Sequence, residues 1–142
     1  MKNSASLIIS STLWIIWGLV HVFYGVFVIS VDAATVVQEI ANAITVPQFQ
    51  YPDALDALLN QHGWNLIWAG VITTIGGYFI WKNSRTAIWV TAVIGGCFDL
   101  GYFMFMDLGG YVLFFPGTLM TIIALTAILL SISANFKNNP SS

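Results

Sequence analysis

Long apolar runs separated by short polar breaks make up most of this chain. A helix needs about 20 mostly apolar residues to cross the roughly 30 Å hydrocarbon core of a membrane. Four runs are long enough: residues 7–31, 63–81, 86–106 and 111–134. The pattern predicts an all-α fold, a polytopic membrane protein whose single domain is a bundle of four transmembrane helices over residues 1–142.

The first run also has the position of a cleaved signal peptide. Lys2 supplies a positive start, and the small residues Ala33 and Ala34 follow the run. The apolar region of a signal peptide, however, spans only about 7–15 residues. The run 7–31 is much longer and includes His21, so we expect it to be retained as the first span.

Composition supports membrane insertion and excludes several classes of protein. The chain is 58% hydrophobic and only 7% charged, whereas about a quarter of the residues in a soluble domain are charged. Its net charge of −2 provides no basic face for nucleic acid, so we expect no nucleic-acid partner. Cys97 is the only cysteine, which excludes a disulfide scaffold and a metal site with several cysteine ligands.

The basic residues predict an orientation. Lys2 precedes the first run, Lys82 and Arg85 separate the second from the third, and Lys137 follows the fourth. With four spans, all of them lie on one side. Because cytoplasmic segments carry an excess of lysine and arginine, we expect both termini in the cytoplasm, and we expect the protein in a bacterial inner membrane.

The one long break, residues 32–62, is then expected outside and in part helical. Its apolar positions predict an amphipathic helix over residues 33–44, ended by Pro47 because the residue before a proline avoids helical dihedrals. Two interpretations stay open for this helix. It lies on the bilayer surface, which is the simpler reading, or it covers the outer mouth of the bundle as a lid.

The rest of this break is expected to contain an extended segment and a second helix. Gln48–Tyr51 is predicted as extended. A short helix is predicted to start at Pro52 and Asp53 and to end at Gly63, where the second span begins. His62 is therefore expected near a helix terminus at the membrane interface.

Two ionisable residues fall inside the predicted spans. His21 and Asp99 each lie on the small-residue face of their helix, in the outer half of the membrane. Because a charged group in hydrocarbon costs at least about 2.5 kcal/mol without a partner, we predict that these two residues meet or share a water molecule. A purely structural explanation remains open, in which the pair only sets helix register.

Further polar and aromatic residues are expected at the same depth, in a pocket that opens outward and is otherwise apolar. Trp17 and Phe98 are expected beside this pocket. The predicted ligand-binding residues are His21, Tyr24, Asn65, Trp68, Asp99 and Tyr102.

Three classes of function are compatible with such a pocket. The first is binding of a hydrophobic small molecule, similar to a quinone or a lipid, or of a partner membrane subunit. The second is a small membrane oxidoreductase or isomerase, with His21 as acid or base oriented by Asp99. The third is a subunit of an oligomeric transporter or channel.

No cofactor is predicted from the residues. His21, His62 and Asp99 are the only candidates for a metal site, and they lack the HxxxH or ExxH spacing of ligands on one helix. Haem ligation by both histidines would require them to face each other across one ring, whereas their predicted depths differ by about 15 Å.

In helix count and length, the chain resembles the DoxX-like and emopamil-binding-protein-like families. Gly25 stands where a carboxylate would follow His21 on the next turn, and the other spans lack the paired glutamates of an isomerase site of the emopamil type. The resemblance therefore implies no activity for this chain.

Overall fold

The computed structural model describes residues 5–46 and 52–138, and all of the regular structure in these ranges is helical. The predicted all-α class is confirmed. Lys2, Pro47 and the expected extended segment 48–51 lie outside the described residues. The elements are α1 (Ala5–Ser30), α2 (Ala33–Ile40), α3 (Asp53–Trp81), α4 (Arg85–Tyr102), the π-helical turns η1 (Phe103–Asp107) and η2 (Phe114–Thr118), and α5 (Leu119–Asn138).

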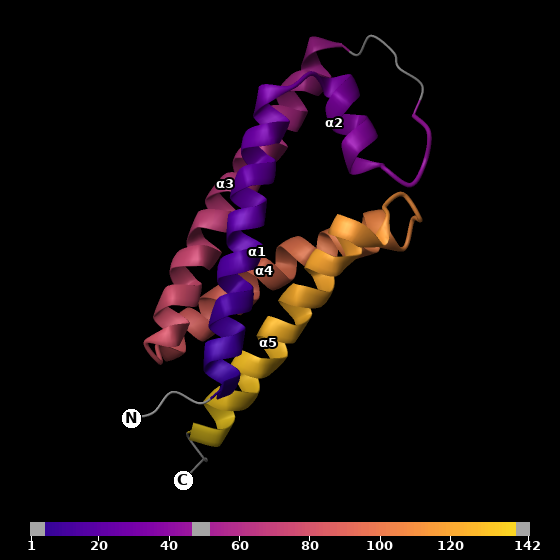
Figure 1. The fold of residues 1–142 in the computed structure, drawn as a ribbon. Helices are drawn as coiled ribbons and strands as arrows, with labels where there is room; N and C mark the ends of the chain where they lie inside the picture. The colour runs from indigo at the N-terminus through magenta and orange to yellow at the C-terminus, as the bar shows by residue number, and fades with distance from the viewer. Residues whose placement is uncertain (1–4, 47–51, 139–142) are drawn as a thin grey trace.

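The long helices form two pairs that meet at one end of the molecule and diverge toward the other (Figure 1). Helices α1 and α3 lie side by side, and α4 and α5 form a second pair that leans away from them. The start of α1 and the end of α5 lie at the closed end. The short helix α2 occupies the open end, between the first pair and the tip of the second.

Three helical segments in the described part of the chain are long and apolar enough to cross a membrane: Ala5–Ser30, Arg85–Asp107 and Phe114–Lys137. The first, third and fourth predicted spans are therefore supported, with boundaries shifted by a few residues. Helix α3 has sufficient length, 29 residues, but its tryptophans, threonines, glycines and Asn65 lower its hydropathy. The predicted bundle of four transmembrane helices is not confirmed.

The expected break at Gly63 is wrong. Helix α3 runs without interruption from Asp53 to Trp81, so the expected short helix and the second span are one element. Gly63 is buried against α1, and it serves close packing rather than helix termination. His62 is consequently an internal residue of α3 and not a helix start.

Glycines allow α1 and α3 to approach each other closely. A methyl group at Gly25 would lie 2.5 Å from the carbonyl oxygen of Gly63, and one at Gly18 would lie 2.5 Å from that of Gly70. We call these four residues the glycine seam. Residue numbers rise along α1 while those of their α3 partners fall, so the helices are antiparallel. Small residues are the usual means of close helix packing in lipid.

The packed core lies at the closed end. Buried serines connect the helices there: the Ser10 hydroxyl donates to the Ala127 carbonyl of α5 at 2.9 Å, and the Ser11 hydroxyl donates to the Gly77 carbonyl of α3 at 2.7 Å. The core side chains are Leu7, Trp14, Trp17, Ile80, Ile88, Ala124, Ala127 and Ala134. The open end lacks a comparable apolar cluster among the described residues.

Substitution of Gly70 by alanine should test the glycine seam. The added methyl group would contact the Gly18 carbonyl oxygen and lie 2.9 Å from the Val22 nitrogen, so a backbone must move. We expect a loss of about 1–3 kcal/mol, measured as thermal or denaturant-induced unfolding in detergent. Gly101→Ala is the matched control because its methyl group would meet no atom within 4 Å. Equal effects of the two substitutions would contradict close packing at the seam.

Candidate ligand-binding cavity

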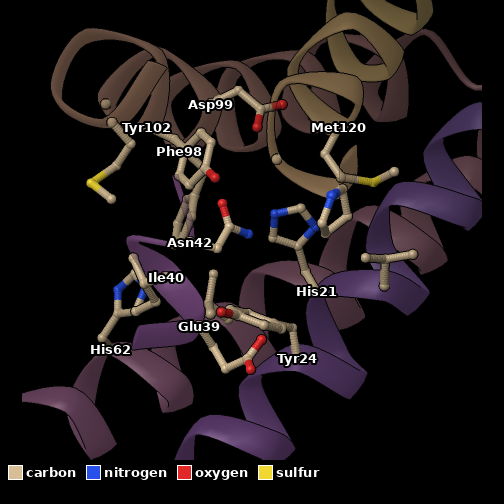
Figure 2. A pocket seen from close by; sticks show the side chains of 16 residues that line it. His21, Tyr24, Glu39, Ile40, Asn42, His62, Phe98, Asp99, Tyr102 and Met120 are labelled. Atoms are coloured by element: carbon tan, nitrogen blue, oxygen red, sulfur yellow. The ribbon is translucent and has the colours of Figure 1, made fainter. Parts of the chain in front are cut away.

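A cavity of about 430 Å³ lies at the open end, between the two helix pairs and beneath α2. All five α-helices and both π-helical turns contribute to its wall (Figure 2). Most of the wall is apolar, with a few polar groups. Its size is within the range of small-molecule sites, about 300–1,000 Å³. The lining residues are Val20, His21, Tyr24, Glu39, Ile40, Asn42, His62, Leu66, Phe98, Asp99, Gly101, Tyr102, Met106, Pro116, Gly117 and Met120.

Trp17 connects the two ionisable residues at the floor of this cavity. Its indole Nε1 donates a hydrogen bond to Asp99 Oδ2 at 2.9 Å. Its ring stacks on the His21 imidazole with centroids 3.6 Å apart, and its carbonyl oxygen lies 2.8 Å from His21 Nδ1. Trp17 is fully buried. The Trp17 side chain therefore holds both His21 and Asp99 in position.

The structure brings His21 and Asp99 to one cavity, as their shared depth suggests, but they are linked indirectly. The described residues contain no hydrogen bond or ion pair between the two. The buried Asp99 carboxylate is instead satisfied by Trp17, a neutral donor on the same helix as His21. An ionisable partner was expected for Asp99, but the indole N–H of Trp17 also satisfies a buried oxygen.

The geometry at His21 determines its tautomer. The Trp17 carbonyl oxygen can only accept a hydrogen bond, so Nδ1 must be the nitrogen that carries the proton in neutral His21. Nε2 then carries the lone pair. The imidazole lies at the cavity wall (Figure 2).

Four of the six predicted ligand-binding residues line the cavity and two do not. His21, Tyr24, Asp99 and Tyr102 are in its wall. Asn65 and Trp68 are not among the wall residues. The Trp68 indole donates to the Asn65 side-chain oxygen at 3.0 Å within α3. The Trp68 ring packs edge-on against Phe98, a wall residue, so it supports the cavity from behind.

Two side chains hold the start of helix α2. Asp32 caps it by accepting from the Thr35 backbone N–H at 2.9 Å, and this bond lowers the pKa of the Asp32 carboxyl. The Ala33 N–H donates to Asp56 of α3 at 2.8 Å. The helix ends at Ile40, earlier than the predicted residue 44, because the Ala41 N–H closes the last turn on Val37.

The segment after α2 is bound to the tip between α4 and α5. The Ala43 N–H donates to the Tyr111 carbonyl at 3.0 Å, and the Leu113 N–H donates to the Asn42 side chain at 2.7 Å. Together with the buried Val36, these contacts place α2 over the cavity. They support the lid interpretation rather than a helix that lies on the bilayer surface.

The metal-site candidates do not come together. Within residues 5–46 and 52–138, no group of three or more His, Cys, Asp or Glu side chains is arranged to hold a metal ion. His21, His62 and Asp99 all border the cavity without forming such a group. The site therefore offers hydrogen-bonding groups rather than a ligand set.

A second, smaller cavity of about 230 Å³ lies between α4 and α5. Asp99 belongs to the walls of both cavities, so the two are adjacent. Several of its wall residues are among the exposed apolar side chains of the predicted spans. Its wall consists of Gly96, Asp99, Leu100, Phe103, Thr121, Ala124, Leu125 and Ile128.

Sequence reasoning missed the contribution of the outer segments. Glu39 and Asn42 belong to the predicted amphipathic helix, where their polarity indicated a solvent-facing side. Met106, Pro116 and Met120 come from the ends of the last two helical segments. Only Met106 had a local signal, because it lies seven residues after Asp99 and therefore on the same helix face.

Comparisons with protein-family models, curated proteins and solved structures found no match for this chain.

Replacing Trp17 with phenylalanine should test the floor of the cavity. Phenylalanine keeps a ring beside His21 but removes the donor to Asp99, so we expect a loss of about 1–3 kcal/mol in unfolding free energy. Trp64→Phe is the control, because Trp64 is 59% exposed. In a double-mutant cycle with Asp99→Ala, which removes the acceptor, effects that simply add would show that the bond contributes nothing.

Proposed function

We propose that this protein is a four-span membrane protein that binds a hydrophobic small molecule, similar to a quinone or a lipid, in the cavity beneath α2. The cavity itself carries the proposal. It is large enough for a ligand, mostly apolar, and supplied with a few polar groups in its wall, which is the usual composition of a small-molecule site.

The packing of α3 supports a fourth span. Helix α1 is apolar and long enough to cross a membrane, and α3 runs antiparallel beside it from Gly77 to Gly63. A helix paired in this way covers the same depth as its partner. The outward face of α3 in this region is also apolar, as expected for lipid contact. Its exposed large apolar residues include Val71, Ile72, Ile75 and Phe79.

The distribution of charge supports cytoplasmic termini. Lys82 follows α3, Arg85 is the first residue of α4, and Lys137 lies near the end of α5, all at the closed end of the molecule. Asp32 and Asp53 lie at the open end. The positive-inside rule places the closed end in the cytoplasm, which favours a bacterial inner membrane with the cavity near its outer side.

Labelling of introduced cysteines should test this topology. In a Cys97→Ser background, we expect a membrane-impermeant maleimide to label Ala57→Cys in intact cells and to label Lys82→Cys only after lysis. The reason is that α3 separates these positions by one membrane crossing. Labelling of both positions in intact cells would contradict a membrane-spanning α3.

The polar groups of the wall indicate how a ligand would be oriented. His21 Nε2, the Tyr24 and Tyr102 hydroxyls and the Asp99 carboxylate provide donors and acceptors for a carbonyl or hydroxyl head. The apolar cavity between α4 and α5, which adjoins Asp99, provides space for an apolar tail. A head and a tail are the two parts of a quinone-like or lipid-like molecule.

A second candidate is a small membrane oxidoreductase or isomerase. The observation that favours it is the fixed tautomer of His21, because an imidazole held through Nδ1 presents Nε2 as a base. Asp99 would then influence His21 through Trp17, which contacts both residues, rather than by direct contact. A transporter or channel subunit receives less support, since Trp14 and Trp17 fill the interior below the cavity. A partner membrane subunit remains a further proposal for the exposed apolar faces.

Filling the cavity should abolish ligand binding without unfolding the protein. A side chain at Gly101 would enter open space in the cavity wall, so Gly101→Phe should compete with a ligand for volume. We expect a ubiquinone with a ten-carbon tail to raise the unfolding temperature of the wild type. Overlap with the new ring costs about 1–3 kcal/mol, so we expect binding to the variant to weaken by about tenfold to a hundredfold.

Val93→Phe is the matched control, because Val93 is 60% exposed on the same helix. Mass spectrometry of apolar molecules that co-purify in mild detergent provides a second measurement. The proposal is wrong if Gly101→Phe and Val93→Phe retain the same molecules and the quinone raises the unfolding temperature of no variant.

A further inference from the structure

Besides two tyrosines, the ionisable side chains described in the wall of the main cavity are carboxyl and imidazole groups. Glu39 and Asp99 are in the wall, together with two histidines, and no lysine or arginine is among the described wall residues. The basic residues of the described chain are Lys82, Arg85 and Lys137, and they lie at the closed end. The cavity is therefore a poor environment for an anionic group and a favourable one for a cation.

Glu39 is the acid at the cavity with no structural partner. It is exposed at the cavity wall. Its carboxylate accepts no hydrogen bond and forms no ion pair within residues 5–46 and 52–138. In Figure 2 this carboxylate lies beside the Tyr24 side chain, across the cavity from Asp99.

Three other acids at this end of the molecule accept hydrogen bonds from the protein itself. Asp32 caps α2, Asp56 holds the Ala33 N–H, and Asp107 accepts from the hydroxyls of Thr118 and Thr121. Glu39 differs from these acids because its carboxylate accepts no hydrogen bond within the described residues. A carboxylate in that position is free to pair with a ligand.

Aromatic rings in the wall add to the preference for a cation. Tyr24, Phe98 and Tyr102 border the cavity. The face of an aromatic ring carries negative potential and attracts ammonium groups within about 6 Å. Acids and ring faces together form the kind of environment that binds amines.

We propose that the cavity selects amphiphiles with an ammonium head over anionic amphiphiles, with Glu39 as the counter-ion and the tail directed toward the cavity between α4 and α5. This inference rests on the proposed function, which requires only an apolar ligand with a polar head. It adds the sign of the charge on that head. Fatty acids and acidic phospholipids are excluded as ligands.

The test uses three probes with the same twelve-carbon chain: dodecylamine, dodecanol and dodecanoate. The full-length protein is held in nanodiscs of zwitterionic lipid at neutral pH, and the affinity is obtained from thermal-shift titrations. We expect dodecylamine to bind about tenfold more tightly than dodecanol, since one charge-assisted contact is worth about 1.4 kcal/mol or more. Dodecanoate should bind most weakly.

Glu39→Gln should reduce the affinity for dodecylamine to about that for dodecanol. Asp53→Asn is the matched control, because it removes one exposed acid from the same end outside the cavity. It also controls for the attraction of charged probes to the nanodisc. Glu39→Lys should reverse the order, so that dodecanoate binds more tightly than dodecylamine.

The possible failures are distinguishable. If dodecanol binds but the wild type shows no preference for the amine, the charge proposal is wrong and the proposed function stands. The charge proposal is also wrong if Glu39→Gln still binds dodecylamine more tightly than dodecanol. The unfolding temperature of this variant without ligand checks that it is folded. If none of the three probes binds, the proposed function fails as well.

Discussion

The hydrogen bond from the Trp17 indole to Asp99 is the interaction on which the arrangement at the centre of the molecule depends. Hydrocarbon offers no partner for a buried carboxylate, so α4 must lie where α1 can supply a donor. The same tryptophan stacks on His21 and joins the packed core below. One core residue thus contacts two residues of the cavity wall, His21 and Asp99.

Much of the fold follows from the apolar runs in the sequence. The runs located the four long helices, because their lengths and polar breaks are read directly from the chain. Gly63 was misread because a glycine ends a helix in one context and permits close packing in another, and only the position of Gly25 on α1 decides between them. The divergence of the two helix pairs was also beyond prediction, since it depends on how four side-chain surfaces fit together.

The site was predicted in part for a similar reason. His21, Asp99 and the tyrosines one turn away share a depth, which the sequence reveals through helical spacing. Glu39 and Asn42 reach the cavity through the path of a connecting segment, and no periodicity encodes that path. Asn65 and Trp68 have the correct depth, but the Trp68 indole donates to the Asn65 side-chain oxygen. The sequence does not reveal whether such a group bonds to a neighbour or faces a cavity.

The attachment of the segment after α2 has a dynamic consequence. It is bound to the tip of the second helix pair by the Ala43 N–H and by the side chain of Asn42. Hydrogen bonds of this kind contribute only about 0.5–1.5 kcal/mol each. An outward movement of this segment would thus leave the four long helices intact, and a small molecule bound as proposed would exchange on the timescale of loop motion instead of that of unfolding.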